Sequence, residues 1–140
     1  MVPHPALLES VAAARHDLGK YVAMNLRWLP PEASTEDLRG ALLVDLGATR
    51  RQGEITEDAA AVWSRVRRPL VGEADLEPGL RVDLSTDPDV QAIDDAIHRI
   101  RQILPDLPTA DPAHLAEARD AAFRVADALT SLQRRFRPIR

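Results

Sequence analysis

A short stretch near the N-terminus holds residue types that could transfer a phosphoryl group: Arg15-His16-Asp17-Leu18-Gly19-Lys20. At about 100° per residue on a helix, His16 points away from the apolar stripe, and Lys20 follows one turn later on the same side. The His16 imidazole supplies a nucleophilic nitrogen, and the Lys20 ammonium offsets the negative charge that develops during transfer. Asp17 can hold one ring nitrogen and raise the basicity of the other. The candidate catalytic residues are therefore His16 as acceptor, Asp17 as orienter and Lys20 as phosphate stabiliser.

The same residues also fit a surface without chemistry. A His-Asp pair on the outer face of an amphipathic helix is commonly a solvated polar surface, and alanines surround His16 on that face at positions 12, 13 and 23. We favour this second interpretation and keep phosphotransfer as the alternative.

Residues 12–29, AAARHDLGKYVAMNLRWL, resemble the His-bearing helix of sensor histidine kinase dimerisation domains and of histidine phosphotransfer domains. His16 and Asp17 match the His-Asp pair of one kinase subgroup, and Leu18 matches the leucine two residues after the histidine. Gly19-Lys20 reverses the Lys-Gly order of the phosphotransfer domains. The resemblance implies a helical bundle, with His16 as phospho-acceptor and a response-regulator receiver domain as partner.

His16 to Lys20 is also similar to a second family, the HD-type metal phosphohydrolases, whose core pentapeptide is His-Asp-(Ile/Leu)-Gly-Lys. That family needs a further metal-binding histidine on a preceding helix and a downstream aspartate. His4 is the one histidine before His16, and it lies in a proline-flanked terminus. Because this ligand set is incomplete, we expect no metal or other cofactor, and a hydrolase or its non-catalytic relic is a remote alternative.

The elements that must position these residues are helices separated by proline and glycine. Pro30-Pro31 ends a first helix over 5–29, and Ser34 with Asp37 forms a capping box for a second helix. Three predicted helices cover residues 5–29, 35–50 and 57–68, and Thr56 caps the third, which ends before Pro69. Two further helices are predicted to begin at Asp87-Pro88 and at Asp111-Pro112. A turn near Gln52-Gly53 precedes the third helix. Residues 71–86 are predicted to be a packed loop, although Leu80, Val82 and Leu84 alternate.

The last two helices carry the strongest periodicity. Their apolar residues recur at alternating spacings of three and four, and a short proline-rich link joins them: Val90, Ile93, Ile97, Ile100 and Leu104, then Leu115, Ala118, Ala122, Val125, Leu129, Leu132 and Phe136. This pattern predicts an antiparallel helical hairpin at the C-terminus. The fold class is therefore all-α, a bundle of four to five helices forming one domain over 1–140. The same spacing also suits a two-chain interface, so a homodimer is an alternative.

Composition limits the function further. The 140 residues hold 18 basic and 22 acidic side chains, a net charge of −4, which argues against a nucleic-acid partner. The chain has no cysteine, and no window has the apolar length of a membrane helix, so we expect a cytoplasmic protein. All but one of the basic residues are arginine, which is typical of a GC-rich bacterial-like coding sequence. We expect a regulatory or adaptor protein that acts by protein–protein interaction in signalling, without catalytic turnover.

Two further groups of polar residues favour structural roles. Helical spacings that recur in bundle metal sites relate Asp94, Asp95 and His98, and also His114 and Glu117. Because His98 lies off the apolar seam, we expect it to form a surface ion pair instead. Asn25 lies on the apolar stripe of the first helix, so we expect it to bond a loop or a neighbouring helix. The arginine-rich C-terminus complements a helix dipole.

Overall fold

A computed structural model of the chain describes residues 5–47, 49–51, 54–72 and 84–136. The chain begins with α1 (Pro5–Ala14), the π-helical turn η1 (Arg15–Gly19) and the 3₁₀ turn η2 (Leu26–Trp28). Then follow α2 (Thr35–Gly47), the short strands β1 (Thr49–Arg51) and β2 (Glu54–Glu57), and α3 (Ala59–Leu70). The last elements are α4 (Pro88–Ile103), the 3₁₀ segment η3 (Leu104–Thr109) and α5 (Pro112–Arg135). The all-α class is confirmed, with one small antiparallel hairpin added to it.

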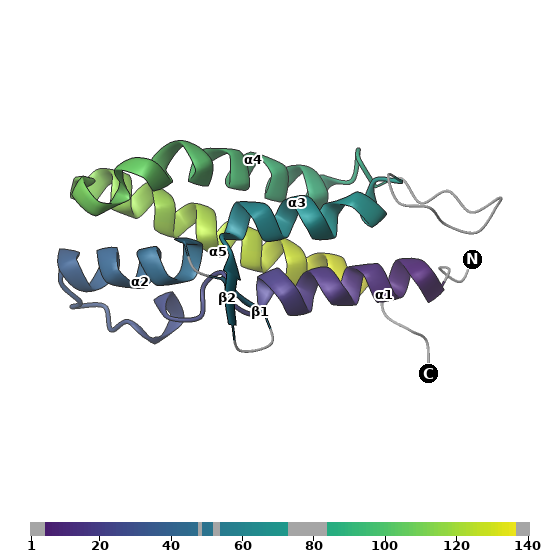
Figure 1. The fold of residues 1–140 in the computed structure, drawn as a ribbon, viewed down its shortest axis with the longest axis horizontal. Helices are drawn as coiled ribbons and strands as arrows, with labels where there is room; N and C mark the ends of the chain where they lie inside the picture. The colour runs from purple at the N-terminus through teal and green to yellow at the C-terminus, as the bar shows by residue number, and fades with distance from the viewer. Residues whose placement is uncertain (1–4, 48, 52–53, 73–83, 137–140) are drawn as a thin grey trace.

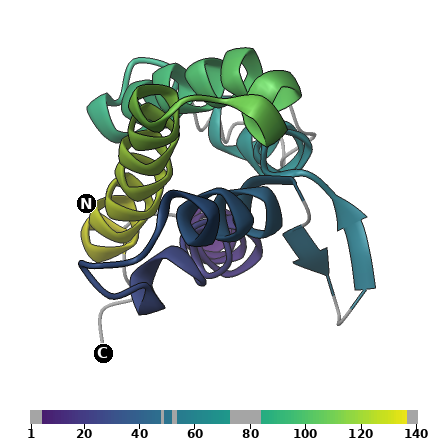
Figure 2. The same cartoon turned by 90° about the vertical axis from the view of Figure 1, so that its left-hand side faces the viewer.

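The longest helix, α5, is the centre of the arrangement. It contacts α4, α2, α1 and the η1 turn. Figure 1 shows α5 running lengthwise, with α3 and α4 on one side and α1 and α2 on the other. In the view along the long axis, α1 lies behind α2, and the β1–β2 hairpin stands at the edge beside α2 and α3 (Figure 2).

Polar contacts at both ends fix α4 and α5 as antiparallel neighbours. Ser131 near the end of α5 donates to Asp89 in the first turn of α4, at 2.9 Å between oxygens. At the opposite end, Arg99 of α4 pairs with Glu117 of α5. This arrangement is compatible with the predicted C-terminal hairpin.

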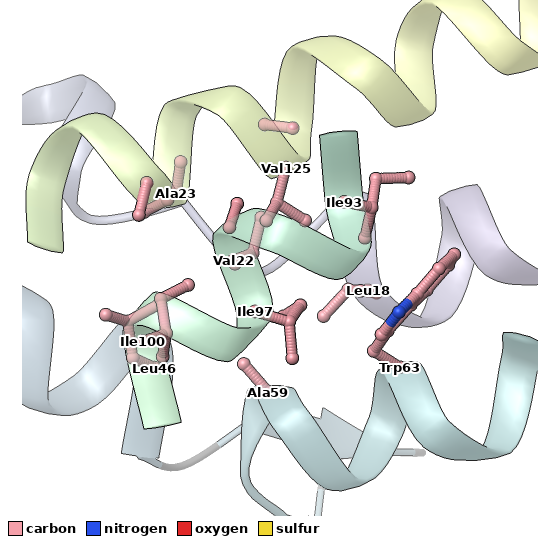
Figure 3. Packing of buried hydrophobic residues seen from close by; sticks show 14 of the residues in the cluster. Leu18, Val22, Ala23, Leu46, Ala59, Trp63, Ile93, Ile97, Ile100 and Val125 are labelled. Carbon is pink, nitrogen blue, oxygen red and sulfur yellow. The ribbon is translucent and has the colours of Figure 1, made fainter. Parts of the chain in front are cut away.

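The core is built from aliphatic side chains on every helix. Leu18, Val22, Trp63, Ile93, Ile97 and Val125 meet in the middle of the molecule (Figure 3). The predicted seams of α4 and α5 lie within this core, because the seam residues from Val90 to Ile100 and from Leu115 to Leu132 are buried inside a single chain. The spacing that suggested a homodimer is therefore used within one chain.

The predicted helix caps are confirmed at three helices. Ser34 accepts from the backbone N–H of Asp37 at 3.0 Å, and the Asp37 carboxylate accepts in return from the Ser34 N–H. Asp87 and Asp111 cap α4 and α5, and a proline follows each of them at the first helical position.

Three predicted boundaries are wrong. The second helix ends at Gly47 rather than residue 50, because the chain then enters β1. The third helix is capped by Asp58 rather than Thr56, since the Asp58 carboxylate accepts from a backbone N–H of the first turn at 2.7 Å. It also continues through Pro69, because the fully buried Leu70 extends the packed face by one residue. The predicted turn at Gln52-Gly53 and most of the predicted loop lie outside the described residues.

The predicted helix over 5–29 is also wrong, since regular α-helix ends at Ala14. In η1 the N–H of Lys20 donates to the carbonyl of Arg15, five residues back, at 3.0 Å. This turn packs on α5. A Cβ on Gly19 would lie 3.1 Å from Cδ of Arg15 and from Cδ1 of Leu129, so a side chain at this position would force its neighbours to move by a few tenths of an ångström.

Substitution of Gly19 tests this packing. We expect Gly19→Val to lower the free energy of unfolding by about 1–3 kcal/mol, because its methyl groups would overlap Leu129. Gly40→Val is the matched control, since a Cβ at Gly40 meets nothing within 4 Å. Urea denaturation of the three proteins is the measurement. Equal stability of the two variants would contradict the close-packing argument.

Candidate functional site

His16 lies on the surface in a short chain of ionic contacts. Its side chain is 66% exposed, and its Nδ1 atom lies 3.0 Å from Oδ1 of Asp17. The other carboxylate oxygen of Asp17 accepts from the guanidinium of Arg65 on α3, at 2.9 Å. Arg65 also pairs with Glu57 at the end of β2, at 3.1 Å. Residues from η1, α3 and β2 thus hold the Asp17 carboxylate in one orientation.

The protonation of Asp17 determines which nitrogen of His16 carries the proton. Burial by itself raises the pKa of Asp17, but hydrogen bonds from His16 and Arg65 outweigh burial and lower the pKa below its usual value. Asp17 is therefore a carboxylate at neutral pH and can only accept hydrogen bonds. The neutral His16 ring must then carry its proton on Nδ1, which leaves the Nε2 lone pair directed away from Asp17.

Lys20 is exposed after the π-helical turn. The sequence prediction placed it one α-helical turn from His16, but the backbone between them follows five-residue spacing instead. The structure gives no contact between the two side chains. The arrangement therefore brings Asp17 to His16 and adds Arg65, which sequence reasoning missed because it lies on another helix.

The residues of the predicted carboxylate–histidine pairs bind different partners and do not gather at one site. Asp94 accepts from the indole N–H of Trp63 at 2.8 Å and from the Arg67 guanidinium, so it joins α4 to α3. His98 contacts Gln102 rather than a carboxylate, contrary to the predicted ion pair. His114 pairs with the capping residue Asp111, whereas Glu117 pairs with Arg99.

Among the described residues, no three histidine or acidic side chains gather closely enough to hold a metal ion. The carboxylate of Asp17, which an HD-type centre would place on a metal, is paired with His16 and Arg65. His4 lies outside the described residues. Of the arginine-rich C-terminus, the structure describes Arg134, which is exposed, and Arg135, which binds Asp87 and Asp89 at 2.7 Å.

A second candidate surface surrounds η2 and α2. Trp28 is 84% exposed, and Val44 on the neighbouring helix α2 is 51% exposed. Met24 and Leu43 add smaller exposed apolar areas. Several exposed large apolar side chains close together are typical of interaction surfaces, because binding a partner removes their apolar surface from water, which is favourable.

The buried residue Asp45 holds this surface in place. Asp45 is 2% exposed, and its carboxylate accepts from the backbone N–H groups of Asn25 and Leu26 at 3.0–3.1 Å and from the Asn25 side chain at 2.7 Å. Burial raises the pKa of Asp45, and these hydrogen bonds partly oppose the rise. Asn25 bonds a neighbouring helix, as predicted. Sequence reasoning missed Asp45, although an aspartate among Leu42, Val44 and Leu46 is a signal of a satisfied buried carboxylate.

A cleft of about 430 Å³ opens between the chain around η2 and the outer face of α5. Its lining combines two arginines with apolar residues, among them the half-buried Phe123. The lining residues are Leu26, Arg27, Leu29, Pro30, Pro31, Ala33, Leu38, Arg119 and Phe123. No lining residue was a predicted site residue. The lining comes from η2, the loop after it, α2 and α5, and it assembles only when these pack together.

Comparison of the chain with models of known protein families, with curated proteins and with solved structures finds no match. Within the described residues, no helix combines the length and the apolar character needed to cross a membrane.

The pairing of Asp17 predicts a pH-dependent stability. Because its folded-state pKa lies below the unfolded value of 3.8, its contribution to stability is present above that pH and is lost as pH falls through the folded-state pKa. We expect Asp17→Asn to reduce the free energy of unfolding by about 1 kcal/mol at neutral pH and by much less near pH 3, measured by urea denaturation. Asp127→Asn, which changes an exposed aspartate on α5, is the control. A loss that is equal at both pH values would contradict the pairing.

Proposed function

We propose that this protein is a small regulatory or adaptor protein that acts by binding another protein, without catalytic turnover of its own. The observation that carries the proposal is the 84% exposure of Trp28. Tryptophan is rarely exposed to this degree in a folded chain, and it is among the residues that contribute most to binding energy at protein interfaces. Val44, Leu43 and Met24 are further exposed apolar side chains, on α2 and just before η2, and α2 contacts η2.

The rigidity of the Trp28 segment supports the same proposal. Asp45 binds the backbone N–H of Leu26, two residues before Trp28, and Pro30 and Pro31 restrict the backbone from two residues after it. A side chain presented from a fixed backbone loses less conformational freedom on binding than one on a loose loop. The segment that carries Trp28 therefore needs little rearrangement to bind a partner.

The proposal includes a protein partner in the cytoplasm and no nucleic acid, in line with the net charge of −4. A second copy of the chain is one form of this partner. Since the seams of α4 and α5 are already buried within one chain, a homodimer would use the exposed surface around Trp28 and Val44.

A double variant tests the adaptor function. We expect Trp28→Ser with Val44→Ser to abolish the crosslinked complexes that the parent protein forms in cells, because the exposed apolar area is lost while the core is unchanged. Both side chains are exposed, so the stability should change by about 0.5 kcal/mol or less for each. The measurement is crosslinking followed by quantitative mass spectrometry, with sedimentation equilibrium of the purified protein.

Arg124→Gln on the outer face of α5 is the control and should keep the complexes. A parent dimer that the double variant converts to a monomer supports the proposal, with a second copy as the partner. Complexes that persist in the double variant, or a parent that is monomeric and forms none, would refute the adaptor function.

A second candidate function, histidine phosphotransfer, is favoured by one observation. Nδ1 of His16 lies 3.0 Å from Asp17, and a neutral ring that donates to this carboxylate leaves the Nε2 lone pair of the exposed ring free to attack phosphorus. In such a transfer Nε2 would form a bond to phosphorus, and the aspartyl oxygen of a phosphorylated receiver domain would leave as a carboxylate. The partner would then be a response-regulator receiver domain, with Lys20 as phosphate stabiliser.

Incubation with a phosphorylated receiver domain tests this second function. We expect label on the parent and none on His16→Gln, because glutamine lacks the nucleophilic nitrogen. His98→Gln, which changes another exposed histidine, is the matched control and should keep the label. Absence of label on the parent, or label on His16→Gln, would eliminate phosphotransfer at this residue.

A further inference from the structure

The cleft between η2 and α5 has a floor and a wall that are held before any ligand binds. Leu26 lies at the floor and is 5% exposed, and its backbone N–H donates to the buried carboxylate of Asp45 at 3.0 Å. The wall is the turn at Pro30-Pro31, which is closed by a hydrogen bond from the N–H of Ala33 to the carbonyl of Pro30 at 3.0 Å. Two consecutive prolines restrict the backbone of this wall. The cleft is therefore preformed.

The size and lining of the cleft match a small organic ligand. Its volume of about 430 Å³ lies within the range that small-molecule sites occupy. Leu29, Leu38 and Phe123 are partly buried and supply the apolar part of a lining whose exposed surface is somewhat more polar than apolar. Burial of an apolar ligand against these side chains is favourable because it removes apolar surface from water.

Two arginines bring positive charge to the lining of the cleft. Arg27 lies on η2 and Arg119 on α5, and both are exposed lining residues. Among the described residues, no hydrogen bond or ion pair is recorded for the Arg27 side chain, which acts on Asp45 only through its charge. The pairing of Arg119 with Asp120 is loose, at 3.6 Å between Nε and Oδ1. Both guanidinium groups can therefore bind an anion from solvent.

We propose that this cleft binds a small organic acid that has one carboxylate and an unbranched or cyclic apolar body. The apolar body would lie against Leu29, Leu38 and Phe123, and the carboxylate would meet Arg27 and Arg119. A monoanion fits better than a phosphate monoester, since Asp45 and Asp120 already offset part of the charge of the two arginines. This site adjoins the protein-binding surface proposed above, because Arg27 and Leu29 flank Trp28, but the two proposals rest on different side chains and either can fail without the other.

A titration with decanoate, followed by ¹H–¹⁵N NMR, tests the proposal. We expect backbone amide signals of Arg27, Leu29, Leu38 and Phe123 to shift in a saturable way. The Trp63 indole signal is the internal reference, because that group is hydrogen-bonded to Asp94 away from the cleft. Decanol has the same chain without the charge, and we expect it to bind about tenfold more weakly.

Three single variants separate this site from general attraction of anions. We expect Arg27→Gln and Arg119→Gln each to weaken decanoate binding about five- to tenfold. Arg124→Gln is the matched control, because Arg124 lies on the same helix as Arg119 but does not line the cleft. Unchanged folding of each variant is checked by its Trp63 indole signal.

Three results would overturn the proposal. They are equal affinity for decanoate and decanol, an equal effect of Arg124→Gln and Arg119→Gln, and shifts that never saturate or that lie outside the cleft. An acidic peptide that shifts the same signals while decanoate does not would also overturn it, because the cleft would then bind a protein segment instead of a small acid.

Discussion

The close packing of η1 on α5 is the contact on which the N-terminal half of the structure depends. At Gly19 the backbone of η1 lies so close to the Leu129 side chain that an added Cβ would stand 3.1 Å from its Cδ1 atom. The π-helical turn brings Leu18 into the core at this point and leaves His16 on the surface. The chain then leaves the helical direction and reaches η2, so the position of Trp28 also follows from this contact.

Charged groups determine how the surface elements attach to that core. Asp45 has the largest effect, since it is buried and satisfies backbone N–H groups at the start of η2 that would otherwise lack partners. The surface ion pairs are weaker because water competes for them, but several of them join elements distant in sequence. Arg65 joins α3 to η1 and β2, and Arg135 joins the end of α5 to the start of α4.

Much of the fold could be predicted from local signals. The capping box at Ser34 and the Asp-Pro pairs at Asp87 and Asp111 act within a few residues, so each start was visible in the sequence. The continuation of α3 through Pro69 was not visible, because it depends on burial of Leu70 against other elements. The close contact of Gly19 with Leu129 was also hidden, since the two residues lie more than 100 positions apart in the chain.

The sequence by itself determined the helical class, the apolar faces of α4 and α5, and the pairing of His16 with Asp17 on an exposed face, because these depend on periodicity and on adjacent residues. Only the tertiary structure decided which side chains stand next to one another across elements. It placed Arg65 on Asp17, buried Asp45 under η2, left Trp28 exposed and brought Arg27 to the same cleft as Arg119. The physical reason is that these contacts join elements far apart in the chain, and their geometry exists only after the helices have packed around α5.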